Sequence, residues 1–302
     1  MDSLSFQGDD RDASQVACRR RARRVRISCA PYRPCSVQLE YQERGSGEPV
    51  LLIHAALLAD WFAPLLTQAS LTQGWRVISY HRAGFAGSSR ARPQMSISDQ
   101  AAHACDLLTA LDIERAHVVG HSSGASIAMQ LALDAPDRVQ SLALLEPVVA
   151  SGPIAEEFGR SEVGPAFGRY AAGDRAGAVD LFMRAVGGPE HAAVVEQRLG
   201  ASALRQVLVD ADTFFQTEGP SAMAWPFGAH DAARLRQPVL LLVGADSREV
   251  YHEGHHWLRE RLPLVEGMVV PEANHLLPLQ QPEHLAEILA AFFAQHPLSA
   301  RG

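Results

Sequence analysis

A chain of 302 residues with 47% hydrophobic residues is long enough for one large α/β domain with an insertion, or for two small domains. A formal net charge of −7 argues against nucleic acid as the main partner, and no apolar run reaches the roughly 18–20 residues that span a membrane. All 27 basic residues are arginines, which excludes a lysine Schiff base and the lysine of a phosphate-binding loop.

The first 34 residues differ in composition from the rest of the chain. They contain eight arginines, most of them in a run at residues 19–26, and four aspartates. No apolar stretch follows the run, so it lacks the pattern of an export signal, whereas a targeting peptide and a basic arm for an anionic partner remain alternatives. We predict a disordered extension over residues 1–34 and a folded part that begins near Ser36.

Cysteine usage indicates a reducing environment. The four cysteines (Cys18, Cys29, Cys35 and Cys105) show no paired C-x-x-C spacing, which argues against a zinc site and a disulfide framework. The histidine-rich segment at residues 252–256 lacks the H-E-x-x-H spacing, so we predict no metal. We therefore expect a cytoplasmic protein.

From Ser36 onward, short apolar segments alternate with helical patterns. The predicted strands lie at residues 37–41, 49–53, 76–80, 116–119, 142–145, 238–243 and 267–270. This alternation predicts a mostly parallel sheet with helices on both faces. It stops over residues 148–234, where helical stripes predict a cap inserted between two parts of the core, at residues 35–147 and 235–297; a separate domain is the alternative.

Residues 120–124 read G-x-S-x-G between a predicted strand and an apolar helix. A sharp strand-to-helix turn lifts the serine hydroxyl clear of the backbone, and its flanking glycines avoid a clash. The helix N-terminus also favours negative charge near that oxygen. We therefore predict Ser122 as a nucleophile.

A serine nucleophile needs a base, and the base needs an acid that orients it. His275 follows the last predicted strand and is our candidate base. Two carboxylates compete as the acid, because Glu146 follows the strand after the serine and Asp246 follows the penultimate strand. We favour Glu146, since a carboxylate at the end of that apolar strand has little structural reason to be there. All four residues follow strand ends, which meet at one edge of a parallel sheet.

The negative oxygen that forms during attack on a carbonyl needs two preplaced donors. We predict the backbone N–H groups of Ser123, directly after the nucleophile, and of Ala56, in the loop after an early strand. Leu57, Trp61 and Trp225 are candidates for an apolar substrate-binding surface, although core packing explains such side chains equally well.

Over roughly residues 36–296 the chain resembles the α/β-hydrolase superfamily. The resemblance is carried by the His54-Ala55-Ala56 loop, residues 81–88, the Ser122 turn and His275. It implies an eight-stranded sheet with a helical cap and no cofactor. Among the departures from the family pattern, Ala55 replaces the usual glycine after the histidine, and His81 replaces the usual aspartate of the D-x-x-G-x-G-x-S loop. We expect both to reshape the mouth of the site and to leave the triad in place.

Within this superfamily, the serine turn together with Glu146-Pro147 looks like the zearalenone-type lactonases, which take a glutamate from this strand end as triad acid. The resemblance implies Glu146 as the acid and leaves the substrate open, because the cap selects it. Haloalkane dehalogenases and epoxide hydrolases use an aspartate nucleophile, so Ser122 argues against both.

We predict a serine hydrolase that cleaves a small apolar carboxylic ester or lactone through an acyl-enzyme, without a cofactor. The alternatives are a cofactor-free perhydrolase or haloperoxidase-like enzyme, and a ligand-binding protein on a hydrolase scaffold. We expect neither nucleic acid nor a membrane as a partner, and a homodimer is compatible with the sequence.

Overall fold

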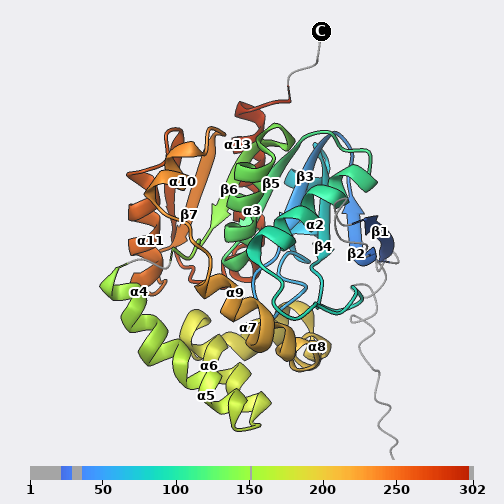
Figure 1. Cartoon of the computed structure of the whole chain (residues 1–302). Coiled ribbons are helices and arrows are strands. Elements are labelled where there is room, and N and C mark those ends of the chain that lie inside the picture. Colours follow the sequence, from blue (N-terminus) through green and yellow to red (C-terminus); the bar gives the residue numbers. More distant parts are fainter. Residues whose placement is uncertain (1–21, 29–35, 150–151, 299–302) are drawn as a thin grey trace, which may run out of the picture.

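The apolar strands pair side by side in a single sheet (Figure 1). The computed structural model describes residues 22–28, 36–149 and 152–298, and within these the sheet has eight strands in the order β1-β2-β4-β3-β5-β6-β7-β8. The strands are β1 (Arg23–Ser28), β2 (Ser36–Arg44), β3 (Glu48–Ile53), β4 (Trp75–His81), β5 (Ala116–His121), β6 (Val139–Leu145), β7 (Val239–Gly244) and β8 (Val265–Val270). Strand β2 pairs antiparallel with β1 and β4, and the other pairs are parallel. The predicted eight-stranded, mostly parallel sheet is confirmed.

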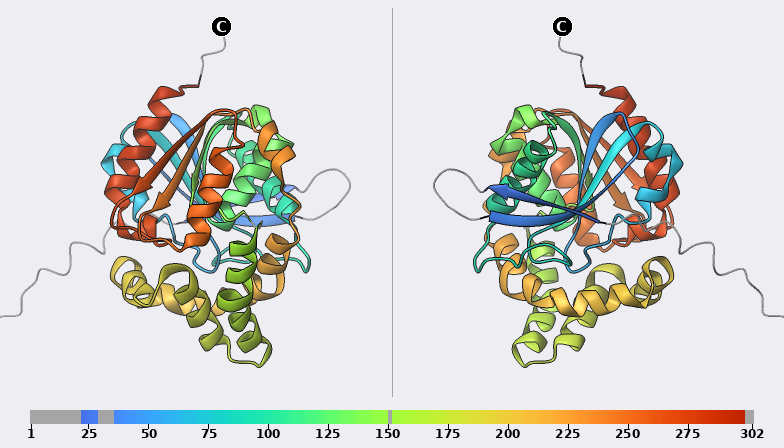
Figure 2. Two further views of the ribbon diagram at one scale, coloured as in Figure 1. Left: turned by 90° about the vertical axis from the view of Figure 1, so that its left-hand side faces the viewer. Right: turned by 90° about the vertical axis from the view of Figure 1, so that its right-hand side faces the viewer.

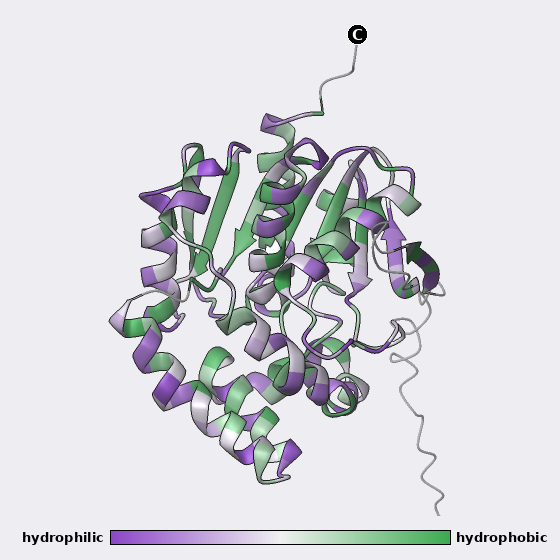
Figure 3. Cartoon of the chain, viewed as in Figure 1, coloured by the Kyte–Doolittle hydropathy of each residue, from purple (hydrophilic) through white to green (hydrophobic). Residues whose placement is uncertain are grey.

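Helices bury both faces of this sheet, which explains why its central strands are continuously apolar. Successive side chains of β3 alternate between two apolar clusters: Leu51 and Ile53 join one, and Val50 and Leu52 join the other. The first cluster contains residues of α2 (Ile97–Ala110), α3 (Ser123–Asp134) and α11 (Glu249–Arg259). The second contains residues of α1 (Ala69–Thr72), α12 (Leu277–Gln280) and α13 (Pro282–Gln295). Figure 2 shows these two helical layers, and Figure 3 shows the hydrophobic strands between them.

The segment between β6 and β7 is helical. Its elements are α4 (Pro153–Phe158), η3 (Gly159–Val163), α5 (Gly164–Ala171), α6 (Arg175–Gly187), α7 (His191–Leu199), α8 (Ala201–Thr213), η4 (Phe214–Glu218), α9 (Gly219–Met223) and α10 (Ala229–Arg234). Two short 3₁₀ turns elsewhere, η1 (Leu65–Thr67) and η2 (Pro136–Arg138), complete the helices of the described residues.

The helices from α4 to α9 form a layer at one end of the sheet (Figure 1, Figure 2). Their buried residues, among them Val207 and Phe215, share an apolar cluster with residues 55–58, which follow β3, and with Leu276, which follows β8. The layer therefore covers the edge at which the parallel strands end. The predicted cap runs to residue 234, but helix α10 at its end contributes Ala232 to the cluster on the sheet face.

The predicted start of the folded part near Ser36 is wrong, because β1 precedes it and pairs with β2. Ile27 is buried and Val25 is half-buried, whereas Arg24 and Arg26 are exposed. The arginine run therefore hides the alternation of an amphipathic edge strand, and charged outward side chains are usual on such edges. The remainder of the predicted extension, residues 1–21 and 29–34, lies outside the described residues, as do Cys18, Cys29 and Cys35; Cys105 carries a free thiol.

In the residues that the structure describes, no helix is long and apolar enough to cross a membrane.

If β1 is part of the core, Ile27→Ala will lower the free energy of unfolding by about 2 kcal/mol, because it deletes buried methyl groups. Arg26→Ala, on the exposed face of the same strand, should change it by less than about 0.5 kcal/mol. Urea denaturation of both variants measures the difference. Equal stability of the two would place β1 outside the cooperative fold.

Candidate active site

Ser122 lies in the turn between β5 and α3 with φ 53° and ψ −119°, a conformation that side chains rarely adopt. The turn is tight on both sides. A Cβ at Gly120 would lie 2.4 Å from the carbonyl oxygen of Gly124, and a Cβ at Gly124 would lie 2.1 Å from the carbonyl oxygen of Ile53. Only glycine therefore fits at either position, and the backbone around Ser122 is held by its neighbours.

His275 follows β8, and its ring reaches Glu146 at the end of β6. The His275 Nδ1 and the Glu146 Oε2 are 3.3 Å apart, and both side chains are at least 98% buried, with exposures of 2% and 0%. The other Glu146 oxygen, Oε1, accepts the backbone N–H of Gly244 at 2.5 Å and the hydroxyl of Ser247 at 2.7 Å. Three groups thus hold this buried carboxylate, which satisfies the requirement that a buried charge be paired.

Asp246, our alternative for the acid, does not occupy the place beside His275. It is exposed, and its backbone N–H donates to the carbonyl of Ala273. Ser247, the next residue in the loop after β7, donates its hydroxyl to Glu146. The geometry therefore contradicts Asp246 as the partner of His275.

Two aromatic side chains that sequence reasoning missed pack around His275. The Tyr251 ring stacks on it at a centroid distance of 4.3 Å, and the His121 ring lies 4.9 Å away with its Nε2 3.0 Å from the His275 carbonyl oxygen. Burial raises the pKa of Tyr251 well above its usual value, helped by the charge of Glu146. Burial also lowers the pKa of His121. Both rings are therefore neutral near pH 7. Of the two residues, only His121 could have been singled out from the sequence, because it lies inside the G-x-S-x-G segment.

The proposed oxyanion donors come from two adjacent strand ends, since β3 and β5 are neighbours in the sheet. Ser123 is the first residue of α3, where backbone N–H groups have no partner within the helix. Ala56 lies in the loop after β3, and its carbonyl accepts the indole N–H of Trp61 at 3.0 Å. Leu57, the next residue, has φ 62°. Strained residues of this kind concentrate at functional sites, and Ser122 and Glu146 are two further examples here.

The three candidate substrate-binding residues do not stay together. Leu57 and Trp61 are buried in the cluster that the loop after β3 shares with the cap. Trp225 instead packs against the cluster on the sheet face, where its indole N–H donates to Gln130 of α3 at 2.7 Å and its ring stacks on Phe227. Trp225 therefore lies apart from the cluster that holds Leu57 and Trp61, because its polar and aromatic partners belong to the sheet face.

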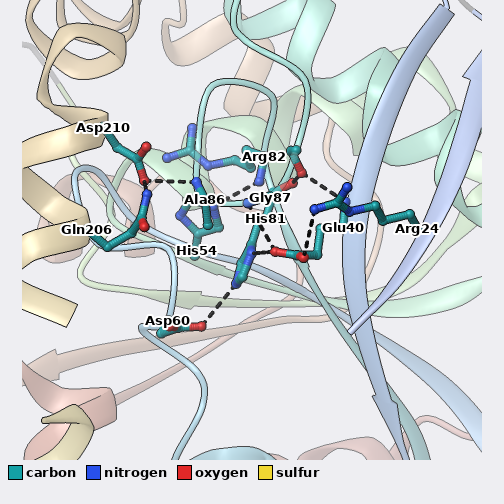
Figure 4. Close-up of polar contacts among 11 residues, drawn as sticks. Arg24, Glu40, His54, Asp60, His81, Arg82, Ala86, Gly87, Gln206 and Asp210 are labelled. Carbon is teal, nitrogen blue, oxygen red and sulfur yellow. Dashed lines mark hydrogen bonds and ion pairs between the residues drawn. The ribbon is translucent and has the colours of Figure 1, made fainter. Parts of the chain in front are cut away.

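His81, the departure from the family pattern, lies between two carboxylates (Figure 4). Its Nδ1 is 2.8 Å from Glu40 Oε2 on β2, and its Nε2 is 3.0 Å from Asp60 Oδ1 in the loop after β3. Burial alone would lower the pKa of His81, but the hydrogen bonds to Asp60 and Glu40 outweigh it and raise the pKa to about 9. A charged imidazolium therefore ties β2 to the loop that carries Ala56 and Trp61. Among the described residues, no cluster of side chains has the arrangement of a metal site.

Sequence reasoning also missed a buried ion pair between Arg82, after β4, and Glu218, at the end of η4. The Arg82 Nη2 and Glu218 Oε1 atoms are 2.7 Å apart, and the same oxygen accepts the hydroxyl of Ser123 at 2.5 Å. Arg82 lies in a segment that the sequence singles out, whereas nothing near Glu218 indicated a partner in the core.

The raised pKa of His81 predicts a pH dependence of stability. A histidine whose folded pKa exceeds its unfolded value of about 6.5 contributes fully below that value, and loses the contribution as pH rises through about 9. The free energy of unfolding should therefore fall between pH 7 and pH 10, and fall less in His81→Asn. The control His230→Asn, at an exposed position, should follow the wild-type curve. Parallel curves for wild type and His81→Asn would contradict the assignment.

A family model for the alpha/beta hydrolase fold matches residues 48–282. The chain is 36% identical over 115 residues, 37% of its length, to the dihydrolipoyllysine-residue acetyltransferase component of the acetoin cleaving system of Cupriavidus necator. It is 26% identical over 260 residues to an uncharacterized carboxylesterase, nap, of Bacillus subtilis, a match that covers 81% of this chain and 79% of that protein. The chain spans between 30% and 64% of the length of the first three curated relatives that it matches.

Solved structures share the fold. A thermophilic esterase from Thermogutta terrifontis superposes with a TM-score of 0.77 over 91% of this chain and 100% of that one, at 20% sequence identity.

Proposed function

The chain belongs to the alpha/beta hydrolase fold family, and from that premise we propose that it is a serine hydrolase that cleaves a carboxylic ester or lactone through an acyl-enzyme. The observation that carries the proposal is the contact between His275 Nδ1 and the buried Glu146 carboxylate. A carboxylate at Nδ1 fixes the proton there and leaves the lone pair of Nε2 available as a base.

The reaction then follows from these groups. Ser122 attacks the carbonyl carbon while His275 Nε2 accepts the hydroxyl proton, and Glu146 stabilises the imidazolium. The N–H groups of Ser123 and Ala56 donate to the oxyanion, and loss of one such donor typically costs about 2.7–4 kcal/mol of transition-state stabilisation. The tetrahedral intermediate collapses, and the leaving alcohol takes the proton from His275. Water, activated by the same histidine, hydrolyses the acyl-enzyme and releases the acid.

The likeness to a carboxylesterase over most of both chains supports an ester as the substrate class. The cluster of Leu57, Trp61 and cap residues beside the donor loop supports an apolar acyl group. A lactone is an internal ester, so the same steps would open its ring.

Replacement of the nucleophile tests the proposal. Ser122→Ala should lower kcat for p-nitrophenyl esters by at least about 10³-fold, because the acyl-enzyme can no longer form. Ester hydrolysis at the parent rate would overturn the proposal. Peroxide-dependent halogenation that exceeds ester hydrolysis in the parent protein would favour the perhydrolase alternative, and saturable binding of an ester without turnover would favour the binding protein.

The two carboxylates can be separated by matched amide variants. Glu146→Gln should lower kcat by about 10²–10⁴-fold, because an amide beside Nδ1 neither fixes the tautomer nor stabilises the imidazolium. Asp246→Asn, a change of the same size at an exposed site, should leave kcat within about twofold, since the charge it removes lies in water. The reverse order of effects, measured by steady-state kinetics, would contradict the assignment of Glu146.

A further inference from the structure

We propose that the buried ion pair of Arg82 and Glu218 positions both donors of the oxyanion hole, so that the cap contributes a positioning residue to the reaction. The inference rests on the proposed function. It concerns how the donors are held rather than which atoms react.

The pair spans the boundary between core and cap. Arg82 follows β4, Glu218 ends the π-helical turn η4, and each side chain is 1% exposed. Arg82 Nη1 also donates to the Gln100 side chain at 2.6 Å. Two charges taken out of water pay a large desolvation penalty, and apolar replacements of such pairs are often equally stable. In addition, Glu218 Oε2 and Arg82 Nε are buried without a hydrogen-bond partner among the described residues. Stability alone is therefore a poor explanation for this pair.

Arg82 holds the peptide group that carries the first donor. Its Nη2 donates to the carbonyl oxygen of Ala55 at 3.0 Å, and the His54 Nδ1 lies 2.7 Å from the same oxygen. The backbone N–H of Arg82 donates to His54 Nε2 at 3.0 Å (Figure 4). Because burial lowers the pKa of His54, the ring is neutral, with the proton on Nδ1 and the lone pair on Nε2.

The Ala55 carbonyl and the Ala56 N–H belong to one planar, trans peptide group, so they point in opposite directions. Two donors on the carbonyl oxygen fix the plane of this group and thereby aim the Ala56 N–H. They also polarise the group, which strengthens the hydrogen bond that the N–H can donate.

Glu218 holds the second donor. Its Oε1, the oxygen that accepts from Arg82, also accepts the hydroxyl of Ser123 at 2.5 Å. This bond ties the side chain of Ser123 to the cap directly after the strained Ser122, and so restrains the orientation of the Ser123 N–H. One carboxylate oxygen therefore links the two halves of the oxyanion hole.

Further contacts hold the cap against the loop that begins at Arg82. Asp210 of α8 accepts the backbone N–H of Ala86 at 2.8 Å, as Figure 4 shows, and the Thr213 hydroxyl donates to the Gly84 carbonyl at 2.8 Å. These contacts keep Glu218 within reach of Arg82 and Ser123. The two donors are therefore aligned only when the cap is packed against the core.

Ser123→Ala tests the inference with the smallest change, because it removes the tether and keeps the backbone N–H. We expect kcat for a p-nitrophenyl ester to fall about tenfold with KM unchanged, less than the 10²–10³-fold loss when a donor is deleted. The inhibition constant of a boronic acid, whose adduct with Ser122 places an oxygen in the oxyanion hole, should rise by a similar factor. The matched control is Ser221→Ala, which deletes a cap hydroxyl that has no partner among the described residues and should change neither value.

Glu218 variants provide the second arm. Glu218→Gln keeps an oxygen that can accept from Ser123 and should retain most of the activity, whereas Glu218→Leu should lose at least as much as Ser123→Ala. Addition of Ser123→Ala to Glu218→Leu should cause no further loss, because both remove the same bond. If Glu218→Leu fails to fold, Ser123→Ala alone decides the matter.

Rates of the variants that keep Ser122 are expressed per site titrated with a fluorophosphonate, and the rate of Ser122→Ala is expressed per protein concentration. An unchanged kcat and boronic acid affinity in Ser123→Ala would overturn the inference, as would a rise in KM without a fall in kcat. Ser122→Ala, assayed in parallel, keeps the two proposals apart. If it retains activity, the proposed function fails; if it is inactive while Ser123→Ala matches the parent, only the positioning role fails.

Discussion

The arrangement depends on one buried carboxylate. Glu146 follows β6 in a conformation that side chains rarely adopt, and its two oxygens contact the end of β7, the loop after it and the ring of His275 after β8. A lone charge at this depth would be too costly to keep, so the Gly244 N–H, the Ser247 hydroxyl and His275 must all be in place. The contact that supports the proposed chemistry therefore also fixes how three strand ends meet.

The sheet explains why these residues can meet at all. Parallel strands end at one edge, so residues distant in sequence project into the same region, and the helical layer from α4 to α9 covers that edge. The charged His81, which ends β4, and the buried Arg82, which follows it, connect this region to β2, to the donor loop and to the cap. Where the family pattern has an aspartate, this chain has His81, whose positive charge bridges the carboxylates of Glu40 and Asp60.

Residues that follow strand ends could be predicted from the sequence, because apolar segments and the G-x-S-x-G turn mark those ends directly. Ser122, Glu146 and His275 are predicted in this way, and the structure brings His275 and Glu146 into contact. Strand β1 was missed because its buried Ile27 stands among arginines, which obscured a period of two. The separate position of Trp225 could not be predicted, because a single aromatic residue carries no periodic signal for its partner. The Arg82–Glu218 pair joins residues 136 positions apart, and only the packing of the cap brings them together.

The most direct test of the central claim is to locate the covalent adduct after treatment with a fluorophosphonate. Mass spectrometry of the digested protein should find the added mass on Ser122 alone, because the proposed function assigns this serine as the nucleophile and the His275–Glu146 pair as its activating groups. An unmodified protein, or an adduct on another serine, would contradict the account.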